Sequence, residues 1–135
     1  MKTLFITLML MISTSIISQT TQKVFVKTFK SDKYEGGVYL DIQGSVEYMN
    51  WDKPYFRIFT TIVTDHNEEI TNKLAQVGRY NYLIEETESM IVLSMPKLNI
   101  DVIIKGKYLN ESLRIIIKMP YGFSKINTST NIILN

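Results

Sequence analysis

The clearest secondary-structure pattern in this chain runs through residues 37–63, GVYLDIQGSVEYMNWDKPYFRIFTTIV. Apolar and polar side chains alternate here, which is typical of strands with one buried face. The positions predicted to face inward are Val38, Leu40 and Ile42 in the first run and Phe56, Ile58, Thr60 and Ile62 in the last. Turn residues at Gln43-Gly44 and at 50–54 divide the segment into two or three strands, which we expect to be antiparallel neighbours.

Further strands are predicted on both sides of this segment. They cover residues 23–30, 80–85, 90–95, 100–104 and 113–118, and residues 132–134 could add a short last strand. A hairpin turn is expected where the acidic residues 86–88 separate two of these runs. The predicted fold class is therefore mainly β, with antiparallel sheets arranged as a sandwich or as the start of a β-solenoid.

One segment has helical periodicity. Its apolar positions are Ile70, Leu74 and Val77. Their spacing of i, i+4 and i+7 places them on one face of a helix. Residues 65–68 have the D-x-x-E form of a capping box, and Gly78 is a natural stop. We therefore predict one α-helix at about residues 66–77, packed on the sheet through this apolar face.

The first residues have the layout of a secretory signal. One lysine precedes an apolar run over residues 4–12, and a Ser/Thr-rich segment leads to a cleavage point at Ser18-Gln19. The apolar run is shorter than the roughly 20 residues that span a bilayer. We expect residues 1–18 to be a signal peptide and residues 19–135 to form a single exported β-rich domain in the periplasm, on the outer surface or outside the cell. The alternative is an uncleaved segment that anchors the chain, which would be its only contact with a membrane.

Composition limits the function further. The chain has no cysteine, so an exported domain has no disulfides and depends on its core for stability. Lys and Arg total 15 and Asp and Glu 13, which gives a net charge of +2. Nucleic-acid-binding domains usually carry a strongly basic surface, so we expect no nucleic-acid partner.

The residues that could support catalysis are few. The only histidine, His66, lies in the acidic stretch 65–69, where acids at a helix start are explained by capping and the helix dipole. Asp41, Glu47 and Asp52 could form a carboxylate pair for glycoside chemistry, but outward-facing acids on strands are usually solvated. We therefore expect no catalytic residue, no metal site and no cofactor, and a protein that is not an enzyme.

Aromatic residues are dense in one short region. They are Tyr34, Tyr39, Tyr48, Trp51, Tyr55, Phe56 and Phe59. Trp51 and Tyr55 flank a predicted loop, where they could form a recognition surface for a glycan or a protein. The alternative is that these rings pack at the rim of a small sheet. Trp51 is the leading candidate for a contact residue, because core packing explains a loop aromatic less easily.

Several short motifs occur in a fixed order along the chain. They are G-S-V-E-Y at 44–48, W-D-K-P at 51–54, Y-F-R-I at 55–58, a helix that leads to Arg79-Tyr80, and the strand-plus-proline L-R-I-I-I-K-M-P at 113–120. This order resembles the bacterial adhesin-like family that includes the head GIN domains, found in exported proteins of Bacteroidetes-type bacteria. Relatives in that family continue into β-solenoid rungs, whereas 15 residues follow Pro120 here. The resemblance implies a short version that lacks most of the solenoid, and the family has no assigned catalytic residues.

These observations lead to two expected functions. The first is a non-catalytic envelope or extracellular β domain that binds or scaffolds, with an unknown protein or glycan partner at the cell surface. The alternative is a carrier for a small apolar ligand, in which the strands curl around an apolar cavity. A carrier predicts a hollow interior, whereas a scaffold predicts a packed one.

Overall fold

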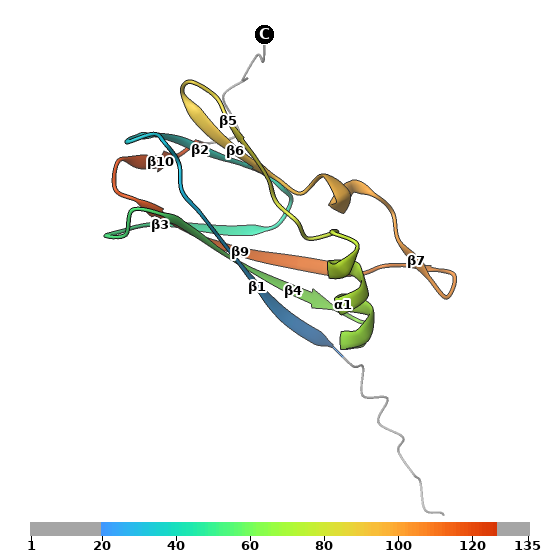
Figure 1. Cartoon of the computed structure of the whole chain (residues 1–135). Helices are drawn as coiled ribbons and strands as arrows, with labels where there is room; N and C mark the ends of the chain where they lie inside the picture. Colours follow the sequence, from blue (N-terminus) through green and yellow to red (C-terminus); the bar gives the residue numbers. More distant parts are fainter. Residues whose placement is uncertain (1–19, 127–135) are drawn as a thin grey trace, which may run out of the picture.

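Two four-stranded sheets pack face to face and form the body of the molecule (Figure 1). In the first sheet the order is β1 (Thr21–Phe29), β4 (Phe56–Thr64), β9 (Glu111–Pro120) and β3 (Ser45–Trp51). In the second sheet the order is β10 (Phe123–Lys125), β2 (Gly36–Asp41), β6 (Met90–Ser94) and β5 (Leu83–Glu86). The predicted fold class is therefore confirmed, and of its two arrangements the sheets form the sandwich.

The computed structural model describes residues 20–126 of the chain. The predicted signal peptide, residues 1–18, and the predicted strand at 132–134 lie outside this range. Within the described range, no helix is both long enough and apolar enough to cross a bilayer.

The strand pairing differs from the sequence prediction for residues 37–63. We expected β2, β3 and β4 to be antiparallel neighbours, and this is wrong. β2 pairs in parallel with β6 in the second sheet, whereas β3 pairs in parallel with β9 in the first. β9 also pairs antiparallel with β4, so it separates β3 from β4. The reason is composition: β9 carries the continuous apolar run Ile115-Ile116-Ile117, which favours a central position where both neighbours cover it.

The alternation itself is confirmed. The inward residues of β4 are fully buried, and they meet buried residues of β9 and of the second sheet. The main core cluster consists of Val38, Leu40, Phe56, Ile58, Ile91, Leu93, Ile115, Ile117, Met119 and Phe123. Thr60 is a buried polar member of this face, and its hydroxyl hydrogen-bonds the Tyr82 hydroxyl at 2.6 Å. The hairpin between β5 and β6 also forms as expected.

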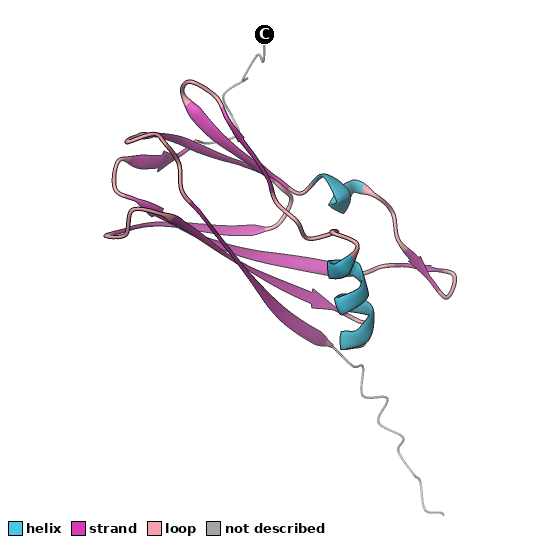
Figure 2. Ribbon diagram, in the orientation of Figure 1, coloured by secondary structure: helices cyan, strands magenta, loops and turns pink. Residues whose placement is uncertain are grey.

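Helix α1 (Glu68–Gln76) lies at one end of the sandwich beside β1 (Figure 2). Its N-cap is Asn67, whose Oδ1 accepts from the backbone N–H of Ile70 at 3.0 Å, so the expected capping role of residue 65 is wrong. The helix ends before Val77, which is 63% exposed.

The buried face of α1 is also shifted from the prediction. It is centred on Thr71, which is fully buried, with Leu74 and Ala75 packed on the smaller core cluster. Gly78 stops the helix as predicted: its φ of +81° is favourable only for glycine, and it lets the Arg79 N–H reach the Leu74 carbonyl at 3.0 Å.

The connection between β6 and β9 contains a short 3₁₀ helix, η1 (Pro96–Asn99), followed by β7 (Ile103–Ile104) and β8 (Lys107–Tyr108). The strand predicted at 100–104 is therefore reduced to two residues in a hairpin of its own. This hairpin projects from the helix end of the sandwich (Figure 1).

Candidate functional site

The structure brings together the two residues that the sequence selects for binding. Trp51 ends β3 and Tyr55 precedes β4, on either side of a short loop. Their rings meet edge to face, with centroids 5.0 Å apart at an interplanar angle of 82°. The Trp51 Nε1–H also donates to the Tyr55 backbone carbonyl at 2.8 Å. The loop therefore holds the two rings in a fixed arrangement.

Two cations lie over these rings. The Arg57 guanidinium is 5.6 Å from the Trp51 ring centroid and 5.4 Å from that of Tyr55. The Lys118 ammonium is 5.4 Å from the Trp51 centroid and 5.6 Å from that of Phe59. Cation–π attraction favours such placements. We call these five residues, Trp51, Tyr55, Arg57, Phe59 and Lys118, the Trp51 surface.

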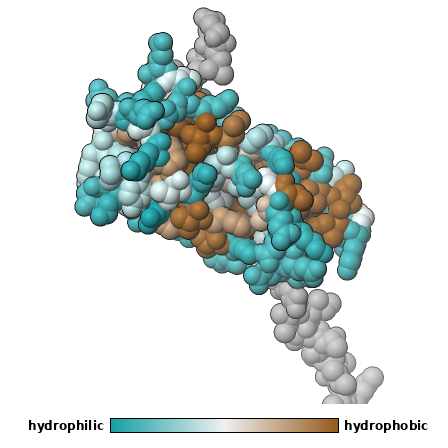
Figure 3. All heavy atoms as spheres, viewed as in Figure 1, coloured by the Kyte–Doolittle hydropathy of each residue, from teal (hydrophilic) through white to brown (hydrophobic). Residues whose placement is uncertain are grey.

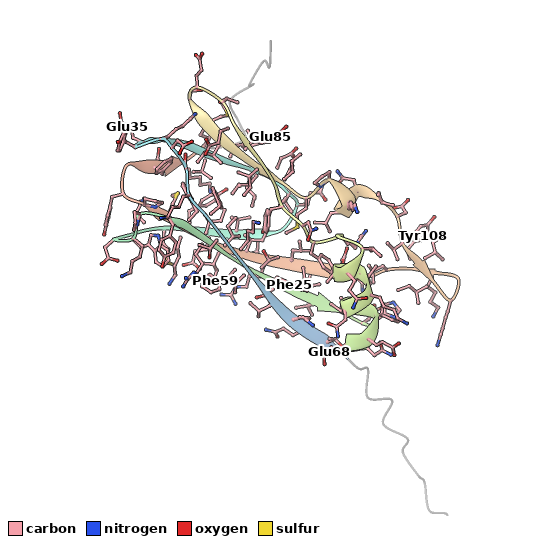
Figure 4. The ribbon with its side chains drawn as sticks, in the orientation of Figure 1. Phe25, Glu35, Phe59, Glu68, Glu85 and Tyr108 are labelled. Carbon is pink, nitrogen blue, oxygen red and sulfur yellow. The ribbon has the colours of Figure 1, made fainter. Side chains whose placement is uncertain are left out.

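The Trp51 surface lies on the face of the first sheet that points away from the second. Arg57 of β4 stands directly opposite Lys118 of β9, and Phe59 stands opposite Ile116. Because their strand neighbours Ile58 and Ile117 are buried inside the sandwich, alternation points the residues between them outward. In Figure 4, Phe59 is labelled on this outer side.

The charges on this surface have no acidic partner. Like charges directly opposite each other on a sheet are destabilising. Among residues 20–126, none of the ion pairs involves Arg57 or Lys118. The protein instead places aromatic rings beside both cations, and Arg57 donates two long hydrogen bonds, to Thr28 Oγ1 at 3.4 Å and to the Tyr55 hydroxyl at 3.5 Å. The arrangement favours an anion that would lie between the two cations and beside the rings.

Sequence reasoning missed both cations. Arg57 could have been found, because it is two residues from Tyr55 on the same strand face. Lys118 could not, because its position depends on β9 pairing with both β3 and β4, and the apolar run of β9 favours a central strand without identifying its neighbours.

A second group of charged residues is buried at the helix end. The Arg79 and Glu111 side chains are each 9% exposed and form an ion pair with an N–O distance of 2.6 Å. Arg79 Nε and Nη2 donate to Glu111 Oε1, and Tyr80 donates its hydroxyl to Oε2 at 2.8 Å. We call these three residues the Arg79 cluster.

The remaining donors of Arg79 are also satisfied. They reach the backbone carbonyls of Lys97, Ile100 and Leu98 at 3.1, 2.8 and 3.4 Å. A guanidinium has five N–H donors, and all are used here inside the protein. The Arg79 cluster therefore has a structural role.

The tyrosines near this cluster are poor acids. Burial and the hydrogen bond to Glu111 raise the pKa of Tyr80 well above its usual value. Burial raises the pKa of Tyr82 to about 12, although its hydrogen bond with Thr60 acts in the opposite direction. Both hydroxyls are protonated at neutral pH, which suits hydrogen bonding rather than base catalysis.

The position of His66 offers no built catalytic arrangement. Its Nε2 is 3.4 Å from Asp65 Oδ1, and its backbone N–H donates to Thr64 Oγ1 at 3.1 Å. Between residues 20 and 126, no group of three or more His, Cys, Asp or Glu side chains is placed to hold a metal ion.

A groove of about 500 Å³ opens beside the Arg79 cluster. Its wall includes Asp41 and Glu111 together with the apolar side chains of Ile42, Met95 and Leu98. Glu111 is already bonded to Arg79 and Tyr80, and the other polar side chains of the wall are those of Tyr39, Asp41, Gln43 and Asn99.

Comparisons of this chain with known proteins found no matching family model, no matching curated protein and no matching solved structure.

Proposed function

We propose that this chain is a non-catalytic, exported β domain that binds an anionic glycan at the cell surface through the Trp51 surface. The observation that carries the proposal is the pair Arg57 and Lys118, which stand opposite each other beside aromatic rings and form no ion pair among residues 20–126. Export and the relationship to the adhesin-like family are parts of the proposal that depend on the sequence motifs.

The residue types support binding over a purely structural role. Tryptophan, tyrosine and arginine dominate the energetics of recognition surfaces. Aromatic rings held by internal contacts lose little freedom on binding, which reduces the entropic cost. The two neighbouring cations favour a ligand with closely spaced carboxylate or sulfate groups, since such groups remove their mutual repulsion.

The interior favours this function over the apolar-ligand carrier. Fully buried side chains from both sheets meet between the layers, including Val38 and Ile91 from one and Phe56, Ile58 and Ile117 from the other. A carrier would need a hollow in this space, whereas side chains fill it.

The only tryptophan of the chain lies in the proposed site, so its fluorescence reports binding directly. Polygalacturonate, heparin and the neutral polymer dextran would be titrated against the protein. We expect a saturable change in emission with at least one of the two anionic polymers and none with dextran. The double variant Arg57→Gln/Lys118→Gln keeps the reporter and should bind about tenfold more weakly or worse.

The matched control is Lys27→Gln/Lys73→Gln, which removes the same charge from exposed lysines outside the Trp51 surface. It should retain wild-type affinity when measured at the same ionic strength. Two results would contradict a glycan site at the Trp51 surface. One is no change in tryptophan emission with either anionic polymer, and the other is an equal loss of affinity in the two double variants.

A further inference from the structure

The β7–β8 hairpin is a well-defined turn at the end of the sandwich. Ile103 pairs with Tyr108 and Ile104 with Lys107. The two turn residues, Lys105 and Gly106, have φ values of +50° and +76°, the left-handed conformations that a tight two-residue hairpin requires. The hairpin therefore has one specified shape.

The strands of this hairpin carry exposed apolar side chains. Ile103 is 61% and Tyr108 70% exposed, and they stand side by side as a cross-strand pair. Ile100, at the base of the hairpin, is 60% exposed. Figure 4 shows Tyr108 beyond the body of the sandwich, and Figure 3 shows hydrophobic residues gathered at this end of the molecule. Two exposed lysines lie on the turn side of this pair: Lys105 is in the turn, and Lys107 pairs with Ile104.

The Arg79 cluster fixes both ends of this segment. Arg79 binds carbonyls at Lys97, Leu98 and Ile100, where the chain leaves the sandwich, and the carboxylate of Glu111, where it returns. Burying an ion pair is costly because both groups lose water. Here the pair ties the base of an exposed hairpin to the sandwich.

We propose that the β7–β8 hairpin docks this domain on an anionic lipid bilayer. The sequence predicts membrane contact only through an uncleaved signal segment, so this is a second and independent contact. Apolar side chains on a protruding hairpin can enter the boundary between headgroups and acyl chains, where tyrosine is favoured. The two lysines would then meet lipid phosphates, to which basic residues near a membrane are attracted.

A bilayer fits this surface better than a protein does. Stable protein interfaces bury on the order of 1,000 Å² or more with complementary shape. A convex tip with two residues per strand offers far less, whereas a fluid bilayer adapts to a convex shape. The pairing of apolar side chains with lysines also selects anionic rather than neutral headgroups.

Flotation with lipid vesicles tests the proposal. One set of vesicles would mix phosphatidylglycerol with phosphatidylcholine, and the other would contain phosphatidylcholine alone. The protein without its first 18 residues should float with the anionic vesicles and not with the neutral ones, and added salt should release it. Ile103→Asp and Lys105→Glu/Lys107→Glu should each weaken binding about tenfold or more.

The matched control for Ile103→Asp is Val24→Asp, which places the same acid at an exposed apolar position, 51% accessible, on β1. It should float like the wild type. A second readout is Tyr108→Trp in a Trp51→Phe background, whose indole should shift to the blue and be quenched by lipids spin-labelled in the acyl chain. Absence of flotation, equal binding to neutral vesicles, or equal loss in Val24→Asp would overturn the proposal. Absence of flotation with intact glycan binding would leave the hairpin available for a protein contact.

Discussion

The cations of this protein lie in two different environments. Arg79 is buried, and every donor on its guanidinium is used by a carboxylate or a backbone carbonyl of the same chain. Arg57 and Lys118 lie on an open sheet face, next to each other and over aromatic rings, with no acidic partner among residues 20–126. All donors of Arg79 are satisfied without a ligand, whereas a bound anion would reduce the repulsion between Arg57 and Lys118.

This contrast separates structural charge from charge available for recognition. A fully satisfied buried cation loses much when one partner is removed, because the other charge stays buried and unpaired. A half-buried cation at the surface, such as Arg57 or Lys118, contributes less to stability, because water and salt still screen it. The two sites should therefore respond in opposite ways to mutation: large stability effects at one, and mainly binding effects at the other.

The largest effect should come from Arg79→Met. It leaves Glu111 and the three carbonyls of the η1 region without their donor, so we expect a loss of about 3–5 kcal/mol in the free energy of unfolding. Chemical denaturation measures this. The control Arg114→Met changes an exposed arginine on β9 and should stay within about 0.5 kcal/mol of wild type. Similar results for the two variants would mean that the Arg79 cluster does not hold the structure together.

Alkaline pH tests the buried region without changing Arg79. The folded-state pKa of Tyr82 is raised from 10.0 to about 12, so the folded protein holds this proton more tightly than the unfolded chain does. The stability from this group is present in full below pH 10 and is lost as the pH rises from 10 to 12. The shift corresponds to about 2–3 kcal/mol.

Denaturation at a series of pH values, with wild type and Tyr82→Phe, measures the effect. The variant should lose less stability over this range, since it has no phenol to ionise at this position. Tyr80, whose pKa is also raised, should still contribute in the variant, so the pH dependence should be reduced and not abolished. Identical curves would show that Tyr82 is not shielded from water.

Trp51→Ala should have an intermediate effect on stability. It removes an aromatic pair and the hydrogen bond to the Tyr55 carbonyl, each worth about 0.5–1.5 kcal/mol, so we expect a loss of about 1–3 kcal/mol. Trp51→Phe keeps a ring but not the donor, and it should lie between wild type and Trp51→Ala in thermal melting. If the melting temperature of Trp51→Ala equalled that of the wild type, the contacts of this ring would not form in solution.

The sequence predicted the inward faces well and the partners of the strands poorly. Alternation in β4 is a local property, and Phe56, Ile58 and Ile62 are buried as expected. The pairing of β3 with β9 joins residues that are distant in sequence, such as Ser45 and Arg114. The turn after β2 does not indicate that the chain passes to the other sheet there. Helix α1 was located to within two residues, but its buried face is centred on Thr71, and Val77 is exposed beyond its end.

The same distinction explains the sites. Trp51 and Tyr55 are close in sequence and could be selected together, whereas the position of Lys118 depends on a strand order that only the folded core determines. The Arg79 cluster was missed for a similar reason. Glu111 is 32 residues from Arg79, and nothing in either local sequence indicates that the two are buried together.

The smallest stability effect should come from Lys118→Gln. This change removes the repulsion from Arg57 directly opposite, which favours folding, and the cation–π contacts with Trp51 and Phe59, which disfavours it. These opposing contributions should leave the free energy of unfolding within about 0.5 kcal/mol of wild type. Affinity for the anionic polymer should nevertheless fall, because the ligand loses one of its two cations. Arg114→Gln, on the same face of the same strand, controls for net charge and should change neither quantity appreciably. If Lys118→Gln lowered the free energy of unfolding as much as Arg79→Met, the two sites would not differ in role, because Lys118 would also be needed for the stability of the fold.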